Sequence, residues 1–188
     1  MLQRLLVLLI AVIGATSALA ADLTIPTTHP RLWFANAARL QQAQAYLQTH
    51  PISPAGGDIQ FERALRGVLA NNASDCDLAA DYLLDWLVEN NGSRRDALRQ
   101  QGEELLLIYD WCHDRFSPAE ISTLVARWNG YLDTENADTF ANRGSEANNY
   151  FWGRVRNNLM WGIASFGDNP RAQQFIDNAL DLRLNQWF

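Results

Sequence analysis

The chain has 188 residues and a formal net charge of −6, with 48% hydrophobic and 11% aromatic residues. This composition can bury a hydrophobic core, which excludes an intrinsically disordered protein. Nucleic-acid-binding domains need a basic face, so the acidic balance predicts no nucleic-acid partner. An acidic substrate stays open, because a few arginines can set the potential inside a cleft. The length is that of one domain or part of one.

Residues 1–20 have the pattern of a secretory signal peptide. Arg4 supplies a positive charge, residues 5–15 are apolar or small, and Ala18-Leu19-Ala20 matches a small-x-small cleavage pattern. The apolar stretch of about 11 residues is shorter than the roughly 20 that a membrane-spanning helix needs. We therefore expect cleavage after Ala20, a periplasmic or secreted protein without a membrane span, and a mature domain over residues 21–188 with a net charge of −7.

Cys76 and Cys112 are the only cysteines. In an exported protein they could form a disulfide that closes a loop of about 35 residues, worth roughly 3 to 4 kcal/mol. Two buried free thiols are the alternative, and the sequence leaves both open. The cysteine spacing fits no zinc template, and His29, His50 and His113 are the only imidazoles. The sequence therefore predicts neither a metal site nor a cofactor.

After an extended segment over Pro26–Pro30, the apolar residues recur at the spacing of α-helices. Asn36 is placed to cap a helix that ends near Thr49. The apolar spacing then predicts further helices over residues 59–69, 75–88 and 94–113. Ser117, Pro118 and Glu120 form a strong start signal for the next helix, because the serine and glutamate side chains can each accept from the other's backbone amide.

The second half of the chain predicts three more helices around one loop. The helix that starts at Pro118 is expected to end near Leu132, and residues 133–146 have no apolar period, which is typical of a loop. A sixth helix is expected over residues 147–166. A turn over residues 167–170 precedes a seventh helix that reaches the last residue.

The predicted fold class is all-α. No hairpin signal separates two alternating segments, and β-branched residues are scarce. Successive helices with short connections pack as antiparallel pairs, which can build a bundle, a solenoid or a closed ring. The absence of a repeat at fixed spacing weakens the solenoid interpretation. The last residues are still helical and apolar at Phe188, so we expect a fragment of a longer protein.

Three segments together resemble one family of polysaccharide lyases. They are His29–Phe34 (HPRLWF), Glu104–Glu120 with its Tyr-Asp-Trp helix, and Glu146–Tyr150 with the helix that follows. The set is similar to the amino-terminal part of the heparinase II/III-like and alginate lyases. The resemblance implies an incomplete α/α toroid of antiparallel helix pairs, of which this chain would hold roughly the first half, and β-elimination in a uronic-acid polysaccharide.

The implied chemistry needs donors that hold the sugar carboxylate and an acid and base near the scissile bond. The alginate lyase branch has an Asn-Asn-His stretch at the start of an inner helix, where this chain has Asn148, Asn149 and Tyr150. The resemblance thus implies Asn149 and Tyr150 as catalytic residues. Ionising a tyrosine at neutral pH requires its pKa to fall by about 3 units, roughly 4 kcal/mol. The implied substrate-binding residues are Asn148, Arg154, Trp152 and Arg143.

Each of these residues also has a plainer interpretation, in which it does not contact a substrate. Asn148 could be only a helix cap, Tyr150 and Trp152 could be packing residues, and the arginines could be solvated surface charges. His29 is expected to be structural, and His113 to be a favourable cation in the last turn of its helix.

Other functions stay open beside the lyase. A non-catalytic helical module that binds glycan or protein is one alternative, and some of the seven tryptophans could hold sugar rings. A glycoside hydrolase is another, with Asp110, Asp114 and Glu146 as candidate carboxylates.

Overall fold

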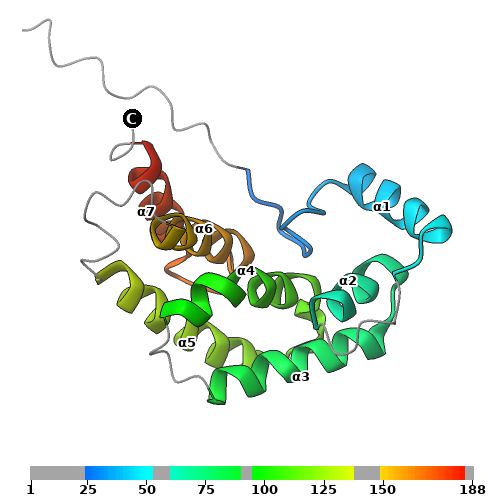
Figure 1. Ribbon diagram of the computed structural model, residues 1–188, viewed down its shortest axis with the longest axis horizontal. Helices are drawn as coiled ribbons and strands as arrows, with labels where there is room; N and C mark the ends of the chain where they lie inside the picture. The colour runs from blue at the N-terminus through cyan, green and yellow to red at the C-terminus, as the bar shows by residue number, and fades with distance from the viewer. Residues whose placement is uncertain (1–23, 53–59, 90–94, 138–148, 185–188) are drawn as a thin grey trace, which may run out of the picture.

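The computed structural model describes residues 24–52, 60–89, 95–137 and 149–184. Within these ranges the chain is all-helical, without a strand, which confirms the predicted class (Figure 1). The elements are α1 (Ala37–Thr49), α2 (Gln60–Ala70), α3 (Ala73–Glu89), α4 (Arg95–Trp111), the short 3-10 helix η1 (His113–Arg115), α5 (Pro118–Ala137), α6 (Asn149–Ala164) and α7 (Ala172–Leu184). Among the described helices, none is both long and apolar enough to cross a bilayer.

The predicted helix starts at Asn36 and Ser117 are confirmed. The Asn36 side chain accepts from the backbone amides of Ala38, at 2.9 Å, and Arg39, at 3.2 Å. The backbone amide of Ser117 donates to the Glu120 carboxylate at 2.7 Å, and the Glu120 amide donates to the Ser117 hydroxyl at 3.3 Å. Each cap supplies partners for amides that the first helical turn leaves unpaired.

The end of α5 differs from the prediction. We expected a loop from residue 133, but α5 continues to Ala137. Tyr131, Leu132 and Glu135 are buried, and Asn136 exchanges side-chain hydrogen bonds of 3.0 Å with Asn158 on α6. Polar residues thus form the last turns because they pair with a neighbouring helix, a contact that apolar periodicity does not record. Residues 138–146 of the predicted loop lie outside the described residues.

The core is built on α4, whose residues 105–111 are all at most 5% exposed. Three aromatic side chains from different helices meet beside it. Trp128 on α5 stacks on Trp161 of α6 with ring centroids 5.7 Å apart, and Tyr109 on α4 meets Trp161 edge-on at 5.2 Å. Burying side chains of this size contributes about 1.5 to 3 kcal/mol each, so this contact holds α4, α5 and α6 together.

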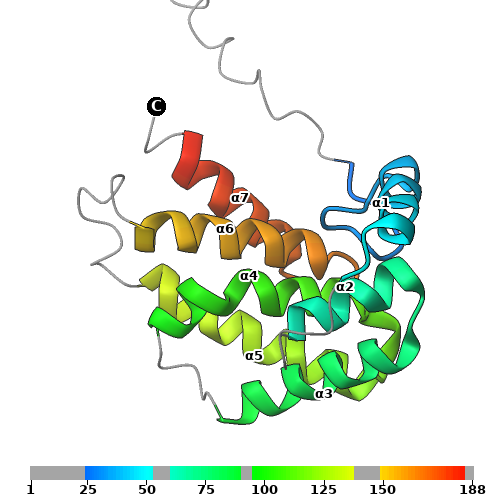
Figure 2. The ribbon, with the colours of Figure 1, turned by 45° about the vertical axis from the view of Figure 1, so that its right-hand side comes forward.

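Contacts between side chains show which neighbouring helices run in the same direction and which run in opposite directions. A Cβ placed on Gly102 of α4 would lie 2.7 Å from the Asn157 side chain on α6, and Tyr109 meets Trp161 further along both helices, so α4 and α6 run in the same direction. The two axes lie side by side in Figure 2. By contrast, Gly162 near the end of α6 packs on Ala172 at the start of α7, and Asn158, earlier on α6, accepts from Asn178, later on α7, at 3.0 Å, so these two helices are antiparallel.

Cys76 and Cys112 form a disulfide with their Cα atoms 5.2 Å apart. The bond joins the first turn of α3 to the residue that follows α4. The structure thereby decides between the two alternatives that the sequence left open. It also fixes the end of α2 in this region, because Gly67 of α2 packs directly on Cys76.

Candidate functional site

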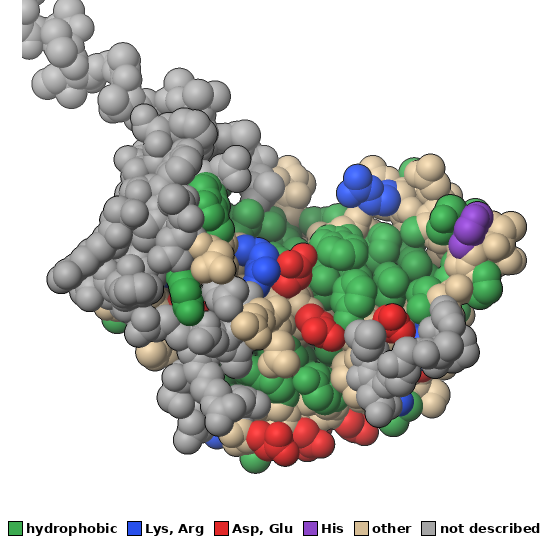
Figure 3. Space-filling model, viewed as in Figure 1, with side chains coloured by type: hydrophobic (Ala, Val, Ile, Leu, Met, Phe, Trp, Pro, Cys, Tyr) green, Lys and Arg blue, Asp and Glu red, His purple; other side chains and the backbone are tan. Residues whose placement is uncertain are grey.

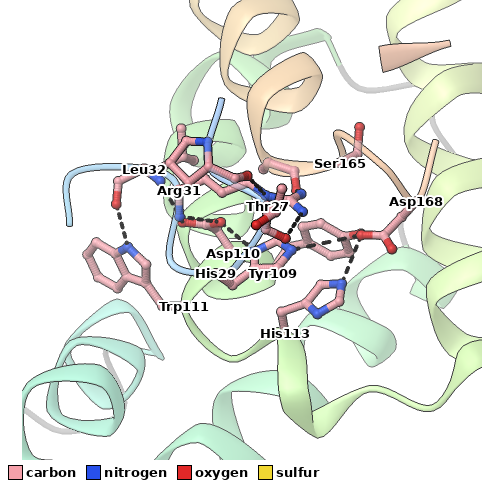
Figure 4. A network of polar contacts seen from close by, with 12 residues as sticks. Thr27, His29, Arg31, Leu32, Tyr109, Asp110, Trp111, His113, Ser165 and Asp168 are labelled. Carbon is pink, nitrogen blue, oxygen red and sulfur yellow. Dashed lines mark hydrogen bonds and ion pairs between the residues drawn. The ribbon is translucent and has the colours of Figure 1, made fainter. Parts of the chain in front are cut away.

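A cluster of polar side chains lies where the segment before α1 meets the ends of α4 and α6 (Figure 4). We call His29, Tyr109, Asp110, His113 and Asp168 the histidine cluster. His29 belongs to residues 24–36, the lead-in to α1. Tyr109 and Asp110 lie in the last turn of α4, His113 begins η1, and Asp168 lies in the turn between α6 and α7. Segments far apart in the sequence therefore supply one site.

Asp110 is the fully buried anchor of the cluster. Its Oδ1 atom lies 2.6 Å from Nδ1 of His29. The carboxylate also accepts from the backbone amide of Arg31, at 3.0 and 2.9 Å, and from that of Leu32, at 2.7 Å. Because an ionised carboxylate can only accept, Nδ1 of His29 is the donor, and in the neutral imidazole Nε2 is left as the acceptor nitrogen.

Arg31 ties the lead-in to the end of α6. Its guanidinium donates to the carbonyl oxygens of Ala164, at 2.7 Å, Pro26, at 3.0 Å, and Thr27, at 3.2 Å. The residue is only 8% exposed. The three carbonyls stabilise a buried cation that would otherwise be costly, so this arginine holds His29 in place from the other side.

The Asp168 carboxylate lies close to Tyr109 and to both histidines of the cluster. Its Oδ2 atom lies 3.0 Å from Nε2 of His113, accepts from the Tyr109 hydroxyl at 3.2 Å, and lies 3.8 Å from Nε2 of His29. The rings of His29 and His113 stack with their centroids 3.8 Å apart and their planes within 9°. Gly167 enables the turn that presents Asp168, because its φ of 95° is a conformation that residues with a side chain rarely adopt.

The surroundings of His113 and Tyr109 shift the pKa of each side chain. Burial lowers the pKa of His113 and the neighbouring His29 adds to this, whereas the charge of Asp168 acts in the opposite direction. Burial raises the pKa of Tyr109 well above its usual range, and the charge of Asp168 adds to that effect. His113 is therefore a neutral imidazole at neutral pH, and Tyr109 keeps its proton as a donor to Asp168.

A cavity of about 780 Å³ opens beside the histidine cluster. It runs between the lead-in, the turn from α2 to α3, and η1. Its lining includes His29, His113 and Asp168 together with the more exposed Asp114. Solvent-borne ligands can therefore reach the part-exposed side chains of Asp168 and His113 at the edge of the cluster.

The residues that the lyase resemblance implies lie at the other end of α6. Asn149 is its first residue and is exposed, while Tyr150 is half-buried. Asn148 and Arg143 lie outside the described residues. At a rise of 1.5 Å per residue, the 16 residues of α6 put roughly 22 Å between Asn149 and the histidine cluster.

Arg154 and Trp152, two of the substrate-binding residues that the resemblance implies, both contact Phe151 on α6. Arg154 is 3% exposed, and its guanidinium carbon lies 5.6 Å from the centre of the Phe151 ring. Trp152 is half-buried and meets Phe151 edge-on at 5.2 Å. Trp152 is thus a packing residue, as in its plainer interpretation. The burial of Arg154 contradicts the solvated surface charge, and Arg154 does not share the exposed surface of Asn149.

A second, smaller cavity lies on the hollowed face that Figure 3 shows, where hydrophobic side chains gather between α4 and α1. Its volume is about 250 Å³, and Trp33, Phe61, Leu107, Gln100, Glu103 and Glu104 line it. Trp33 is 48% exposed and has a φ of 59°, which is uncommon for any residue except glycine. An exposed aromatic ring beside carboxylates and an amide is typical of carbohydrate binding.

Sequence reasoning missed the histidine cluster as a site. It treated His29 as structural and His113 as a helix-end cation, and it judged metal binding from the cysteine spacing and the small number of histidines. The signal that was available is the Tyr-Asp-Trp-Cys-His run at the end of α4, which puts two buried polar residues and a histidine within five positions. A search of protein families, of curated proteins and of solved structures finds no match to this chain.

Proposed function

We propose that this chain is the amino-terminal part of the α/α toroid of a uronic-acid polysaccharide lyase, exported from the cytoplasm. In this proposal Asn149 and Tyr150 at the start of α6 bind the substrate and take part in β-elimination. The observation that carries the proposal is the exposed Asn149 side chain at the start of a helix that runs in the same direction as α4.

The directions of the other helices support a toroid of antiparallel pairs. The Phe61 amide at the start of α2 donates to Glu104 at 3.3 Å, and the end of α2 reaches the disulfide at the end of α4, so α2 shares the direction of α4 and α6. α3 opposes α4, because Cys76 at its start bonds Cys112 and Trp86 near its end donates to Gln101 at 2.9 Å. One row of parallel helices thus alternates with helices of the opposite direction.

This alternation brings the starts of α2, α4 and α6 to the same end of the molecule. A substrate carboxylate there would meet the positive end of the α6 dipole and the Asn149 amide. In β-elimination a base removes the proton on C5, negative charge builds up on the carboxylate, and the 4-linked oxygen leaves. A donor that strengthens as this charge develops contributes on the order of 3 kcal/mol. The Tyr150 hydroxyl would supply the proton that the departing oxygen takes.

The Cys76–Cys112 disulfide supports export. Disulfides persist in oxidising compartments and are rare in the cytosol. This agrees with the signal peptide that residues 1–20 predict.

The Trp33 cavity favours a second function, a non-catalytic glycan-binding module. Its exposed indole offers a face for a sugar ring, and Glu103 and Glu104 offer acceptors for sugar hydroxyls. Arg156 pairs with Glu103 at 3.2 Å, but the Glu104 carboxylate would repel a uronate, so this function predicts a preference for neutral oligosaccharides.

The test is to titrate the mature chain with alginate, heparin-like and pectic oligosaccharides by calorimetry and to follow the ultraviolet absorbance of the unsaturated product. We expect Asn149→Ala to weaken binding of the uronate at least tenfold, and Tyr150→Phe to lower turnover more than binding. Gln41→Ala, which removes an exposed amide on α1, is the matched control and should change neither.

The outcomes separate the two functions. Binding of neutral oligosaccharides that Trp33→Ala abolishes, without turnover of any uronate, would support the glycan-binding module instead. Uronate binding that is equal in wild type and Asn149→Ala would contradict the role of the α6 start.

A further inference from the structure

We propose that His29, His113 and Asp168 form a binding site for a divalent transition-metal ion of the zinc class, with its remaining position open to the large cavity. The ligand atoms are Nε2 of both histidines and a carboxylate oxygen of Asp168. The inference is independent of the lyase proposal, because none of these residues lies at the start of α6.

The three ligand atoms already converge. One nitrogen or oxygen from each residue lies within 4.8 Å of the other two. The Asp168 Oδ2 atom lies 3.0 Å from His113 Nε2 and 3.8 Å from His29 Nε2. Ligands at the bond lengths usual for zinc stand roughly 3.3 Å apart around a tetrahedral ion, which falls between these two distances.

Nε2 of His29 is the atom whose surroundings indicate a bound ion. It is buried, and it has no hydrogen-bond partner among the described residues. The Nδ1–H group of the same ring donates to Asp110, so in the neutral ring Nε2 carries a lone pair, 3.8 Å from the Asp168 carboxylate. A buried acceptor nitrogen without a donor is costly, and a metal ion would satisfy it.

The surrounding residues orient the ligands as metal sites require. Histidines that bind metals usually donate their other N–H to a carboxylate or carbonyl, which fixes the ring and raises its basicity. Asp110 does this for His29 and is itself held by the Arg31 and Leu32 amides. Tyr109 donates to Asp168 in the same way, at 3.2 Å.

Metal binding requires one local adjustment. The rings of His29 and His113 are parallel and 3.8 Å apart, so no point lies in the plane of both. Asp110 fixes His29, whereas His113 stands on η1 at the edge of the cavity with its side chain 19% exposed. His113 is therefore the ring that tilts. Its proton moves from Nε2 to Nδ1, so its hydrogen bond to Asp168 is lost and the freed carboxylate oxygen binds the ion.

The ligand set selects the class of ion. Two imidazoles and one carboxylate suit zinc and its neighbours among the first-row metals, whereas calcium and magnesium prefer oxygen ligands. Three protein ligands with a fourth, open position are the arrangement of reactive zinc sites rather than of closed structural ones.

The experiment measures binding of Zn²⁺ to the untagged mature chain by competition with a chromophoric chelator, and the visible spectrum of the Co²⁺ form. We expect one ion per chain and a tetrahedral cobalt spectrum. His29→Ala, His113→Gln and Asp168→Asn should each weaken binding at least tenfold, and circular dichroism without metal shows that each variant is folded.

Two control variants remove similar groups outside the site. His50→Ala removes an exposed imidazole directly after α1, and Asp114→Asn removes a carboxylate that lines the same cavity but pairs with Arg115. Both should bind Zn²⁺ as the wild type does. No binding by the folded wild type, or an equal loss in His50→Ala and His113→Gln, would overturn the proposal.

Discussion

Asp110 binds the backbone amide of Arg31 through both carboxylate oxygens, 79 positions away in the sequence, at 3.0 and 2.9 Å. Asp110→Asn would put an NH₂ group where one of these oxygens accepts. Because the site is fully buried, the mismatched donors remain without water, and we expect the free energy of unfolding to fall by about 1 to 3 kcal/mol. Urea denaturation measures this loss, and faster hydrogen exchange at Arg31 and Leu32 locates it. Asp114→Asn, on an exposed side chain, should cost no more than about 0.5 kcal/mol.

The disulfide between Cys76 and Cys112 should contribute a large part of the stability. It closes a loop with a sequence separation of 36, for which the chain-entropy model gives about 3 to 4 kcal/mol. We expect the double variant Cys76→Ala/Cys112→Ala to lose this amount in urea denaturation. A reducing agent should destabilise the wild type and leave the double variant unchanged. Equal effects of the reductant on both proteins would contradict a disulfide in solution.

Gly162 on α6 allows α7 to approach closely. An added Cβ would lie 2.5 Å from Ile176 and 2.8 Å from the backbone oxygen of Ala172, which cannot move without displacing α7. We expect Gly162→Ala to destabilise the protein by about 1 to 3 kcal/mol through this overpacking. Gly130 on α5 is the matched control, because a Cβ there meets nothing within 4 Å. Gly130→Ala should stabilise the protein by about 0.5 to 1 kcal/mol, and thermal unfolding of both variants checks the opposite signs.

The Arg66–Asp75 ion pair between α2 and α3 should make stability depend on acid pH. The guanidinium donates to the carboxylate at 2.9 and 3.0 Å and holds the pKa of Asp75 below its usual range, although burial opposes this. A lowered folded-state pKa contributes stability above the unfolded-state value, and this is lost as the pH falls through the folded-state value. We expect Asp75→Asn to lose up to about 1 kcal/mol at neutral pH and nothing once the pH has fallen below the folded-state pKa of Asp75. A difference from wild type that stays constant over this range would contradict the pairing.

The helices were predictable wherever local chemistry decides them. The α1 cap at Asn36 and the Ser117–Glu120 capping box are short-range hydrogen bonds, and both are confirmed. The end of α5 was predicted wrongly for residues 133–137, because its last turns depend on contacts such as Asn136 with Asn158. Such polar contacts between helices have no period that a single sequence reveals.

The histidine cluster could not be predicted from spacing. His29 and Asp168 stand near opposite ends of the chain, and only the fold brings them to within 3.8 Å. The burial of Arg154 could not be predicted for a related reason, because the sides of α6 that are covered depend on helices elsewhere in the chain. Asn149, by contrast, is exposed, as a residue that binds substrate must be.

The Arg31 guanidinium donates to the carbonyl oxygen of Ala164, 133 positions away in the sequence, and this sequence separation affects the order of folding. Bringing such remote residues together carries a large entropic cost and slows the step that requires it. Leu32, which bonds Asp110 and Trp111, cannot be buried before α4 has formed. Synthesis proceeds from the amino terminus, so the first described segment of the chain is among the last to reach its native position.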